Sequence, residues 1–510
     1  MKLVTSSQMR ALDEAAIKGG IPSLDLMERA GKGVAELVKK KFPKKDIVSV
    51  VSGKGNNGGD GLVAARHLAK AGYNVQVYLL SPWSEFSPDA RTNWERLAGL
   101  NVSVHEDFSD VNIKKASCIV DAILGTGLTN DVTGRYRAAI EFINSLLKPV
   151  VSVDIPSGLS ADTGEPLGVA IRAKYTVTFG LAKLGLFTGS EYAREVTVID
   201  IGIPEKLIKG TGYNLVEPSL FAGFFGERPR QAHKGDFGHL LVIGGSTGKI
   251  GAGLLACRGG LRVGTGLVTY ALPASAYVKF DTKSPEIMYE GLSDNGKGII
   301  GKEAVSALRL LFQNKDAASL GPGIGTSDDT KKAVCEIIRK VSIPLVLDAD
   351  GLNCLAGNME ALKDAKQPLV LTPHQGEMSR LTGLDIKEIK ADRVGVAKSF
   401  AKKYHVYTVL KGHRTVTATP DGNIFINPTG NPGMASAGMG DVLTGVIGGL
   451  IAQKIPVETS VVAGVYLHGL AGDIASSEIG ERGLVASDVI NALPRAIETI
   501  GNQCKSLLNL

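Results

Sequence analysis

The sequence is poor in aromatic residues, in net charge and in long apolar runs, and each scarcity excludes a class of protein. Aromatic residues are 5% of the 510 residues, which argues against surfaces that stack nucleic-acid bases. A net charge of +6 suits anionic small ligands but lies far below the charge density of nucleic-acid-binding proteins. No apolar run approaches about 18 residues and no signal peptide opens the chain, so we expect no membrane partner.

Cysteine is also scarce. The five cysteines are scattered, odd in number and never spaced as CxxC, which excludes a disulfide framework and a zinc site. Reduced thiols are typical of the cytosol, so the sequence predicts a cytoplasmic protein. Glycine, by contrast, is abundant, and 63 glycines suit many tight turns between strands and helices.

Continuous apolar strands alternate with helices in both halves, which predicts an α/β protein with parallel sheets covered on both faces. The alternation lapses between Pro204 and Arg230, so we expect a first domain of residues 1–210 and a second of 221–510. Helices should begin at Thr5 or Ser6, with Ser23 capping the second. The predicted strands are Ile47–Val51, Val75–Leu80, Cys118–Asp121, Val150–Asp154, Tyr175–Phe179, Val196–Ile199, His239–Gly244, Leu267–Tyr270, Ala318–Leu320, Leu345–Asp348, Leu369–Thr372, Tyr407–Lys411 and Val416–Ala418. Further helices are predicted at Gly61–Ala71, Ala138–Leu147, Val442–Ala452 and Ser460–Ile474.

The loop from Asn431 to Asp441 carries the strongest sign of a functional site. Its glycines and small residues let backbone N–H groups approach an anion, and the helix that follows adds its positive dipole end. The carboxylate of Asp441 could there take a proton from a hydroxyl that attacks phosphorus. The alternative is a glycine-rich turn with an acidic helix cap, and the number of small residues favours the anion site.

Other strand ends of the second half carry polar or glycine-rich clusters. They are Gly321–Gly325, Asp348–Asn353, Thr372–Met378 and Lys411–Thr415, and the last offers cations for phosphates. His374 alone would more often be a satisfied histidine, but the alignment of the clusters favours one nucleotide-and-substrate cleft. The stretch Gly244–Ile250 resembles a P-loop but lacks the hydroxyl that binds magnesium.

The first half has a GxGxxG spacing between Ser52 and Gly61, at a strand-to-helix turn. The ribose-binding acid of a dehydrogenase is missing, so we interpret the turn as a phosphate-holding turn of a Rossmann-like sheet. Asn57, Asp121 and Ser157 lie near strand ends and could converge as oxygen ligands of a hard cation. Taken singly, each would be read as a cap or turn residue.

These motifs, in this order, resemble those of the bifunctional NAD(P)H-hydrate repair enzymes. The first half matches through Gly53–Gly61, Asp121–Gly127 and Asp154–Gly158. The second matches through Gly321–Gly325, Asp348–Asn353, Thr372–Glu377, Lys411–Thr415 and Asn431–Asp441. The resemblance implies an N-terminal epimerase domain with a Rossmann-like doubly wound sheet. It implies a C-terminal ribokinase-like α/β domain that acts as an ADP- or ATP-dependent dehydratase.

The resemblance also implies the chemistry. Water adds to the nicotinamide ring of NADH or NADPH and gives R and S hydrates, called NAD(P)HX. The first domain would interconvert them with Asp154 as acid/base. The second would phosphorylate the hydrate hydroxyl with Asp441 as base, and loss of phosphate would restore the ring. The expected cofactors are ADP (favoured over ATP), Mg²⁺ and K⁺, and the expected partners are NAD(P)HX and the nucleotide. We also expect a homo-oligomer.

The site residues follow from the same resemblance. Hydrate would contact Asn56, Asn57, Gly58, Gly59, Asp60, Gly125, Thr126, Gly127, Leu128, Thr129, Asn130, Asp131 and Tyr136 in the first domain, and Gly323, His374 and Asp441 in the second. Nucleotide would contact Lys411, Gly412, His413, Arg414, Thr415, Asn431, Gly433, Met434, Ala435, Ser436, Ala437, Gly438, Met439 and Gly440. Potassium would be held by Asn57, Asp121 and Ser157.

Two other functions stay open on the sequence alone. The second half could belong to a small-metabolite kinase, which would release a stable phosphate ester where a dehydratase releases free phosphate. The first half could be a binding module without catalytic activity. The motifs around Gly323 and His374 favour the dehydratase.

Overall fold

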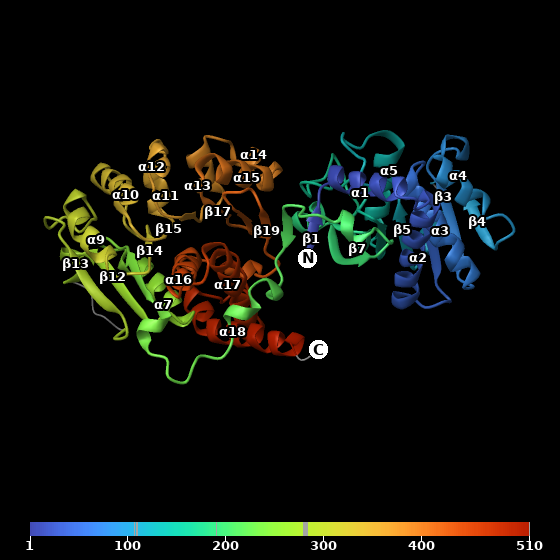
Figure 1. The fold of residues 1–510 in the computed structure, drawn as a ribbon. Coiled ribbons are helices and arrows are strands. Elements are labelled where there is room, and N and C mark those ends of the chain that lie inside the picture. The colour runs from blue at the N-terminus through green and yellow to red at the C-terminus, as the bar shows by residue number, and fades with distance from the viewer. Residues whose placement is uncertain (107, 109–110, 190, 279–283, 509–510) are drawn as a thin grey trace. The chain divides into compact units, whose positions relative to one another are not determined.

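The computed structural model describes residues 1–106, 108, 111–189, 191–278 and 284–508 (Figure 1). The chain forms two compact units, Lys2–Tyr213 and Asn214–Leu510, and Met1 groups with the second. Each unit has its own sheet covered by helices, wholly parallel in the first and mostly parallel in the second, which confirms the predicted α/β class with two domains. The division at Tyr213 falls inside the segment where the strand–helix alternation lapses, and the borders at residues 210 and 221 stay predictions.

The sheet of the first unit is parallel throughout, with the order β4-β3-β2-β5-β6-β7-β9. The order reverses direction between β2 and β5, and the carboxyl ends of strands at such a switch point form a crevice for ligands. The strands are β2 (Ile47–Ser52), β3 (Asn74–Leu79), β4 (Val102–His105), β5 (Cys118–Ala122), β6 (Val150–Val153), β7 (Ala173–Phe179) and β9 (Ala193–Ile199). Beside them β1 (Lys2–Val4) pairs in parallel with β8 (Ala182–Lys183).

Helices cover both faces of this sheet. Val48 and Val50 pack in one core with residues of α2 and α3, and Val51 and Ile119 pack in another with residues of α5. Because both faces are buried, the strands are apolar almost without interruption. The helices are α1 (Ser6–Lys18), α2 (Ser23–Lys41), α3 (Asn56–Lys70), α4 (Pro88–Glu95), α5 (Gly134–Ser145) and α6 (Gly185–Thr188).

Some boundaries differ from the predictions. Helix α3 begins at Asn56 and not at Gly61, since its glycines lie where the helix packs closely. A Cβ added at Gly58 would lie 2.0 Å from the backbone oxygen of Gly53. The cap of α2 is Pro22, and Ser23 is its first residue. Strand β6 ends at Val153, so Asp154 lies in the loop.

The sheet of the second unit has the order β13-β12-β11-β14-β15-β16-β17-β18-β19. It is parallel as far as β17, and β18 and β19 are added antiparallel. The strands are β11 (His239–Ile243), β12 (Leu267–Pro273), β13 (Met288–Leu292), β14 (Ala317–Leu320), β15 (Leu345–Leu347), β16 (Leu369–Leu371), β17 (Tyr407–Leu410), β18 (Val416–Ala418) and β19 (Ile424–Ile426), and β10 (Tyr213–Leu215) lies at the start of the unit.

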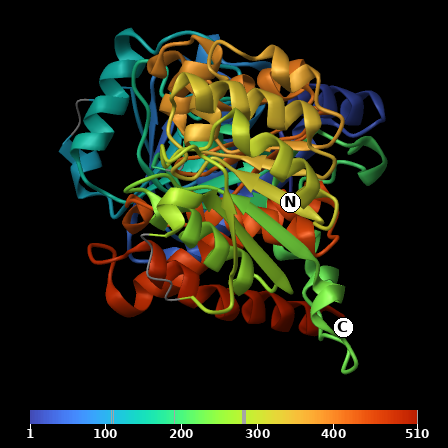
Figure 2. The same ribbon diagram turned by 90° about the vertical axis from the view of Figure 1, so that its left-hand side faces the viewer.

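Two layers of helices enclose this sheet (Figure 2). Helices α7 (Ile250–Arg262), α16 (Met439–Ala452), α17 (Val457–Ile479) and α18 (Ala486–Leu508) lie on one face, and α10 (Asp328–Lys340), α11 (Asp350–Leu355) and α13 (Gln375–Thr382) on the other. The shorter helices are α8 (Ala274–Tyr277), α9 (Val305–Phe312), α12 (Glu360–Lys363), α14 (Ile386–Ala391) and α15 (Arg393–Tyr404). Helix α16 is buried from Val442 to Ala452, as its uniformly apolar sequence predicts.

Candidate active sites

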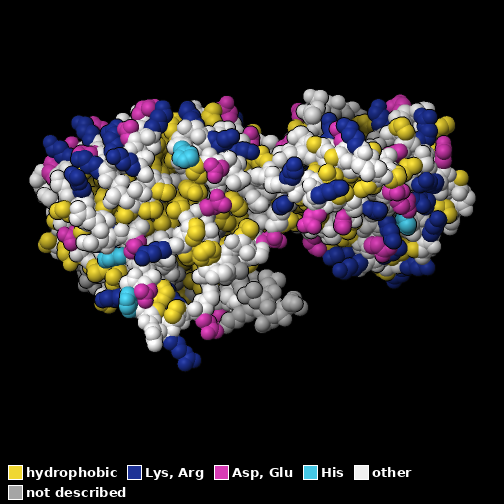
Figure 3. All heavy atoms as spheres, viewed as in Figure 1, with side chains coloured by type: hydrophobic (Ala, Val, Ile, Leu, Met, Phe, Trp, Pro, Cys, Tyr) yellow, Lys and Arg dark blue, Asp and Glu magenta, His cyan; other side chains and the backbone are white. Residues whose placement is uncertain are grey.

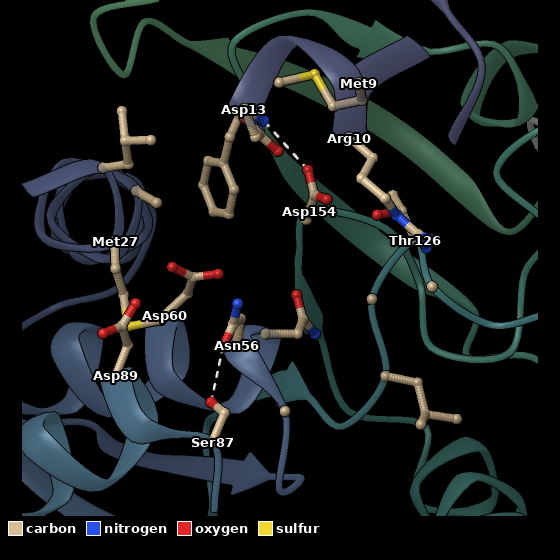
Figure 4. Close-up of a pocket in the computed structure, with 18 of the residues that line it drawn as sticks. Met9, Arg10, Asp13, Met27, Asn56, Asp60, Ser87, Asp89, Thr126 and Asp154 are labelled. Carbon is tan, nitrogen blue, oxygen red and sulfur yellow. Dashed lines mark hydrogen bonds between the residues drawn. The ribbon is translucent and has the colours of Figure 1, made fainter. Parts of the chain in front are cut away.

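A cavity of about 750 Å³ lies in the first unit, at the carboxyl ends of β2, β5 and β6 (Figure 4). This is the switch point of the sheet, where ligands of doubly wound folds bind. Helices α1, α2 and α3 contribute further walls, together with residues of α4, α5, β7 and β8. The predicted residues that line it are Asn56, Asn57, Asp60, Gly125, Thr126, Gly127, Leu128, Tyr136 and Asp154.

Five other predicted hydrate contacts lie outside the lining. Gly58 and Gly59 face the protein interior, and a Cβ at Gly59 would lie 2.7 Å from the sulfur of Met27. Thr129, Asn130 and Asp131 are exposed in the loop before α5. The two glycines therefore serve the packing of α3, and their small size brings Asn56 and Asn57 to the cavity.

Asp154 is held by an ion pair at the base of this cavity. Its Oδ1 accepts hydrogen bonds from the ammonium of Lys183, from Thr178 Oγ1 at 3.1 Å and from the Phe179 N–H at 3.3 Å. Lys183 is 1% exposed. The backbone of Asp154 has a φ of +64°, which is uncommon for a residue with a side chain. Such local strain occurs often at functional sites.

Two of the further carboxyl groups that line the cavity have raised pKa values. Burial and the neighbouring Asp154 raise the pKa of Asp13 to about 6, although Lys183 opposes the shift. Burial and Asp154 also hold the pKa of Asp60 well above its usual range. Sequence reasoning missed Asp13 and Lys183, together with Arg10 of α1. The spacing of Arg10 and Asp13 places both on one face of a helix, but that spacing is too common to indicate a site.

Of the three predicted potassium ligands, Asp121 and Ser157 are joined by hydrogen bonds. Asp121 is fully buried and accepts hydrogen bonds from Ser157, from Ser152 Oγ at 2.7 Å and from the Ile123 N–H at 3.4 Å. Burial raises its pKa against the effect of these bonds. The Nδ2 atom of Asn57 is buried without a hydrogen-bond partner. Asn57 lines the cavity, whereas Asp121 and Ser157 lie outside its lining.

A second cavity, of about 670 Å³, lies in the second unit. It extends from the ends of β15, β16 and β17 to the first turn of α16. The predicted residues in its lining are His374, Lys411, Gly412, His413, Arg414, Thr415, Asn431, Met434, Ala435, Gly438, Met439, Gly440 and Asp441. Gly433, Ser436, Ala437 and Gly323 lie outside the lining. Gly323 accepts a hydrogen bond from Ser246 Oγ at 2.7 Å, in the loop after β14.

A buried ion pair lies at the base of the second cavity. Lys411 Nζ donates to Asp348 Oδ1 at 2.6 Å, and Thr444 Oγ1 donates to Asp348 Oδ2 at 2.7 Å. Burial alone would raise the pKa of Asp348, but Lys411 holds it below its usual range. Burial likewise opposes the charge of Lys411, yet Asp348 and Glu377 raise its pKa. Both groups are therefore charged at neutral pH.

Asp441 lies next to this pair in the first turn of α16. The helix begins after Gly438, whose φ of +88° suits glycine. An added Cβ there would lie 2.6 Å from Leu255 Cδ1. Burial and the nearby Asp348 raise the pKa of Asp441 to about 7, while Lys411 opposes the shift. Asp441 is thus no helix cap, and it can accept a proton near neutral pH.

His374 and the loop after β18–β19 complete this site. His374 caps α13, and its Nδ1 accepts from the N–H groups of Gly376 at 2.9 Å and Glu377 at 3.2 Å. Burial and Lys411 lower its pKa. Asn431 donates to Asp473 at 2.9 Å, which anchors the start of the glycine-rich loop. Sequence reasoning did not assign Asp473, Thr444 or the lining residues Thr429, Gly430 and His468.

The surface carries mixed charge. On the face drawn in Figure 3, Lys and Arg side chains are interspersed with Asp and Glu, as the small net charge predicts. Among the residues that the structure describes, no helix is both long and apolar enough to cross a membrane.

Comparisons with known proteins cover the whole chain. Residues 240–495 match a family model described as NAD(P)H-hydrate dehydratase, and residues 23–185 match one described as YjeF-related protein N-terminus. A protein of Thermofilum pendens named bifunctional NAD(P)H-hydrate repair enzyme Nnr is 41% identical over 100% of this chain and 98% of its own length. The protein of that name in Moorella thermoacetica is 40% identical over 100% of this chain and 99% of its own length.

A solved structure agrees with the fold of the second unit. A ribokinase-like superfamily protein from Enterococcus faecalis V583 superposes with a TM-score of 0.50 and 26% identity, over 57% of this chain and 98% of that protein. This confirms the predicted ribokinase-like fold.

Proposed function

The chain belongs to the family of bifunctional NAD(P)H-hydrate repair enzymes, and we propose how the residues of each unit divide its two activities. The family's activities are the epimerisation of NAD(P)H hydrate and its nucleotide-dependent dehydration. We assign the epimerisation to residues 1–210 and the dehydration to residues 221–510.

In the dehydratase unit, Asp441 is proposed as the general base. The observation that carries this proposal is its position in the first turn of α16, with its pKa raised to about 7 beside the Asp348–Lys411 ion pair. The hydrate hydroxyl attacks the terminal phosphorus of the nucleotide, and its proton passes to Asp441. The bond from phosphorus to the rest of the nucleotide breaks as the ester forms. Phosphate then leaves with the C–O electron pair and takes up a proton from the neighbouring ring carbon, whose C–H electron pair restores the ring double bond. The N–H groups of Gly438, Met439 and Gly440 would stabilise the developing charge.

The nucleotide would bind along Lys411–Thr415 and the loop Asn431–Gly440, with Gly323 and His374 toward the hydrate. Support comes from the cavity that joins most of these residues and from their cationic and N–H donors, which suit phosphates. We propose ADP in preference to ATP. Mg²⁺ would bind the phosphates and neutralise their charge, as is general in phosphoryl transfer.

In the epimerase unit, Asp154 is proposed as an acid/base group acting on the hydrate. It lines the cavity together with Asn56, Asn57, Asp60, Gly125–Leu128 and Tyr136, which would contact the dinucleotide. We further propose contacts from the exposed residues Thr129–Asp131 to parts of the ligand outside the cavity. Gly58 and Gly59 would act through the position of α3.

Potassium is proposed to be held by Asn57, Asp121 and Ser157. The donor set fits, because the buried carboxylate of Asp121 accepts only from uncharged groups among the hydrogen bonds of the described residues. Buried charges are usually paired or bound to a metal. No cluster of three His, Cys, Asp or Glu side chains that could hold a metal occurs in the described part of the chain, so hydroxyl and amide oxygens would supply the other ligands. The ion would neutralise Asp121 and order the loop after β5.

Cell location and assembly remain proposals as well. Cys118, Cys257, Cys335 and Cys354 are free and buried, which supports a reducing compartment such as the cytoplasm. Self-association into a homo-oligomer stays a prediction.

One experiment tests both assignments. Purified R or S hydrate is incubated with the whole chain and ADP or ATP, and the return of NADH absorbance is followed. Asp441→Asn should lower the rate on both hydrates by about 10²–10⁴-fold and leave nucleotide binding nearly intact. Asp154→Ala should slow use of the R hydrate alone, measured briefly against an enzyme-free control. An Asp441→Asn enzyme with more than half its rate would exclude Asp441 as the base, and release of a stable phosphate ester would indicate a kinase.

A further inference from the structure

Asp13 of α1 lies in the cavity of the first unit, near the Asp154–Lys183 ion pair (Figure 4). Its Oδ1 is buried and has no hydrogen-bond donor. Buried polar atoms are nearly always paired in folded proteins. A ligand hydroxyl or ring N–H that enters the cavity would supply the missing partner.

The charged groups around Asp13 come from three other elements. Lys183 of β8, Asp154 after β6 and Asp60 of α3 all interact with it electrostatically. On its own helix, Arg10 and Glu14 also line the cavity. Burial and Asp154 outweigh Lys183, so the pKa of Asp13 rises to about 6. A carboxyl group with such a pKa can hold and release a proton near neutral pH.

Asp154 is arranged differently. The Lys183 ammonium, Thr178 and the Phe179 N–H all donate to its Oδ1. Among the hydrogen bonds of the described residues, none uses its Oδ2. With Oδ1 held by three donors, Oδ2 is the atom of Asp154 that is placed to accept a proton from the hydrate. The cavity therefore contains a candidate base and a separate candidate acid.

We propose that Asp13 is a second catalytic residue of the epimerase, which protonates the ring nitrogen while Asp154 takes the proton of the hydroxyl. This inference rests on the proposed role of Asp154 in the first unit. It assigns a proton donor that neither the sequence motifs nor the glycine-rich turns indicate.

The step balances as a ring opening and closing. The hydroxyl proton passes to Asp154, its electron pair forms a C=O bond, and the bond from that carbon to the ring nitrogen breaks. The released pair on the nitrogen takes the proton of Asp13. The carbonyl then turns its other face to the nitrogen. The same transfers in reverse close the ring with opposite configuration, return the proton on the nitrogen to Asp13 and pass the proton on Asp154 back to the hydroxyl oxygen.

The test compares Asp13→Asn, Asp13→Glu and Asp154→Ala in the full chain, with Asp25→Asn as a matched control on the exposed surface of α2. Hydrate of R configuration is supplied with nucleotide, and the S hydrate reports whether the second unit is intact. Asp13→Asn should lose about 10²-fold of the R-hydrate rate above the uncatalysed background. The S-hydrate rate and the Asp25→Asn enzyme should be unchanged.

A pH profile separates catalysis from folding. With Asp13 as the acid, R-hydrate use should fall as the pH rises through about 6, because the donor form is lost. Asp13→Glu should retain this decline at a reduced rate, and Asp13→Asn should abolish it. If Asp13→Asn keeps both rate and decline while Asp154→Ala is inactive, the inference on Asp13 is wrong and the proposed role of Asp154 stands. If both variants keep full activity, the proposed epimerase site itself is wrong.

If Asp13→Asn unfolds the first unit, far-ultraviolet circular dichroism followed through thermal unfolding will reveal the loss. The activity of Asp13→Glu then tests the proposal. A folded Asp13→Glu enzyme whose R-hydrate rate no longer falls as the pH rises would overturn the proposal.

Discussion

The two cavities use the same electrostatic arrangement for different chemistry. Each contains one lysine paired with one carboxylate, the buried Lys183 with Asp154 and the partly buried Lys411 with the buried Asp348. In each, burial and the paired carboxylate raise the pKa of a neighbouring acid, Asp13 to about 6 and Asp441 to about 7. The ion pair thus provides a fixed charge, and the neighbouring acid provides a group that exchanges protons near neutral pH.

The cavities differ in what surrounds that arrangement. The second has the first turn of α16, whose unpaired N–H groups face the same space as Asp441. The first is lined by five carboxyl groups, Asp13, Glu14, Asp60, Asp89 and Asp154, and has no comparable loop of small residues at Asp154. Phosphoryl transfer requires a site for a polyanion, whereas epimerisation needs only proton transfers. The comparison indicates that a lysine–carboxylate ion pair is common to both cavities, whereas the helix N-terminus is specific to the second.

Substitution of Lys411, the lysine of the second cavity, should have the largest effect on stability and activity. Lys411→Met leaves Asp348 buried without its cation, which we expect to cost about 3–5 kcal/mol of unfolding free energy. Loss of a cation beside the phosphates should also lower dehydration by about 10²-fold or more. Thermal or urea unfolding and the S-hydrate assay measure the two effects.

The control for this variant is Lys387→Met, an exposed lysine of α14, which should change neither quantity by a measurable amount. Because Lys411 opposes the raised pKa of Asp441, the residual activity should also need a higher pH. An unchanged stability together with an unchanged rate would mean that the Asp348–Lys411 pair has neither role.

The pH dependence should separate the two activities, with an effect of about tenfold per pH unit. Asp441 acts as a base only when it is ionised, so S-hydrate dehydration should fall as the pH drops through about 7. Asp13 acts as an acid only when it is protonated, so R-hydrate epimerisation should fall as the pH rises through about 6. Rates measured on each hydrate from about pH 5 to about pH 9, the range in which these groups titrate, show whether each rate changes with pH in the expected direction. Parallel profiles for the two hydrates would contradict the assignment of distinct acid and base groups.

The extent to which the sequence predicted the fold depends on burial. Strands buried on both faces, such as β2 and β5, are apolar without interruption and were placed within about one or two residues. Strands β4 and β13 are partly exposed and were missed. Helix α18 was missed as well, although Val489, Leu493, Ala496 and Ile500 are buried at helical spacing.

The prediction of the sites follows a similar division. Motifs at the ends of strands and in the glycine-rich loop before α16 indicated Asp154, Lys411 and Asp441, and the structure places these residues at the two cavities. Asp13 and Lys183 lie on α1 and on the short strand β8, which carry no such motif. Their proposed roles depend on burial and on neighbouring charges, which tertiary structure alone determines. The same holds for Thr444, one helical turn beyond Gly440, to whose carbonyl it donates.

Separation of the units should have the smallest effect of all. Each unit has its own sheet and its own cores, and domains with these properties usually fold alone. A cut between Ile208 and Phe221 should therefore leave the second fragment with an S-hydrate rate within about twofold of the whole chain. The first fragment, added back separately, should restore use of the R hydrate, and the fragment carrying Asp13→Asn should not. An insoluble second fragment, or one inactive on the S hydrate, would show that the two ion-pair sites depend on one another. Their similarity would then be a property of the intact chain and not of two independent units.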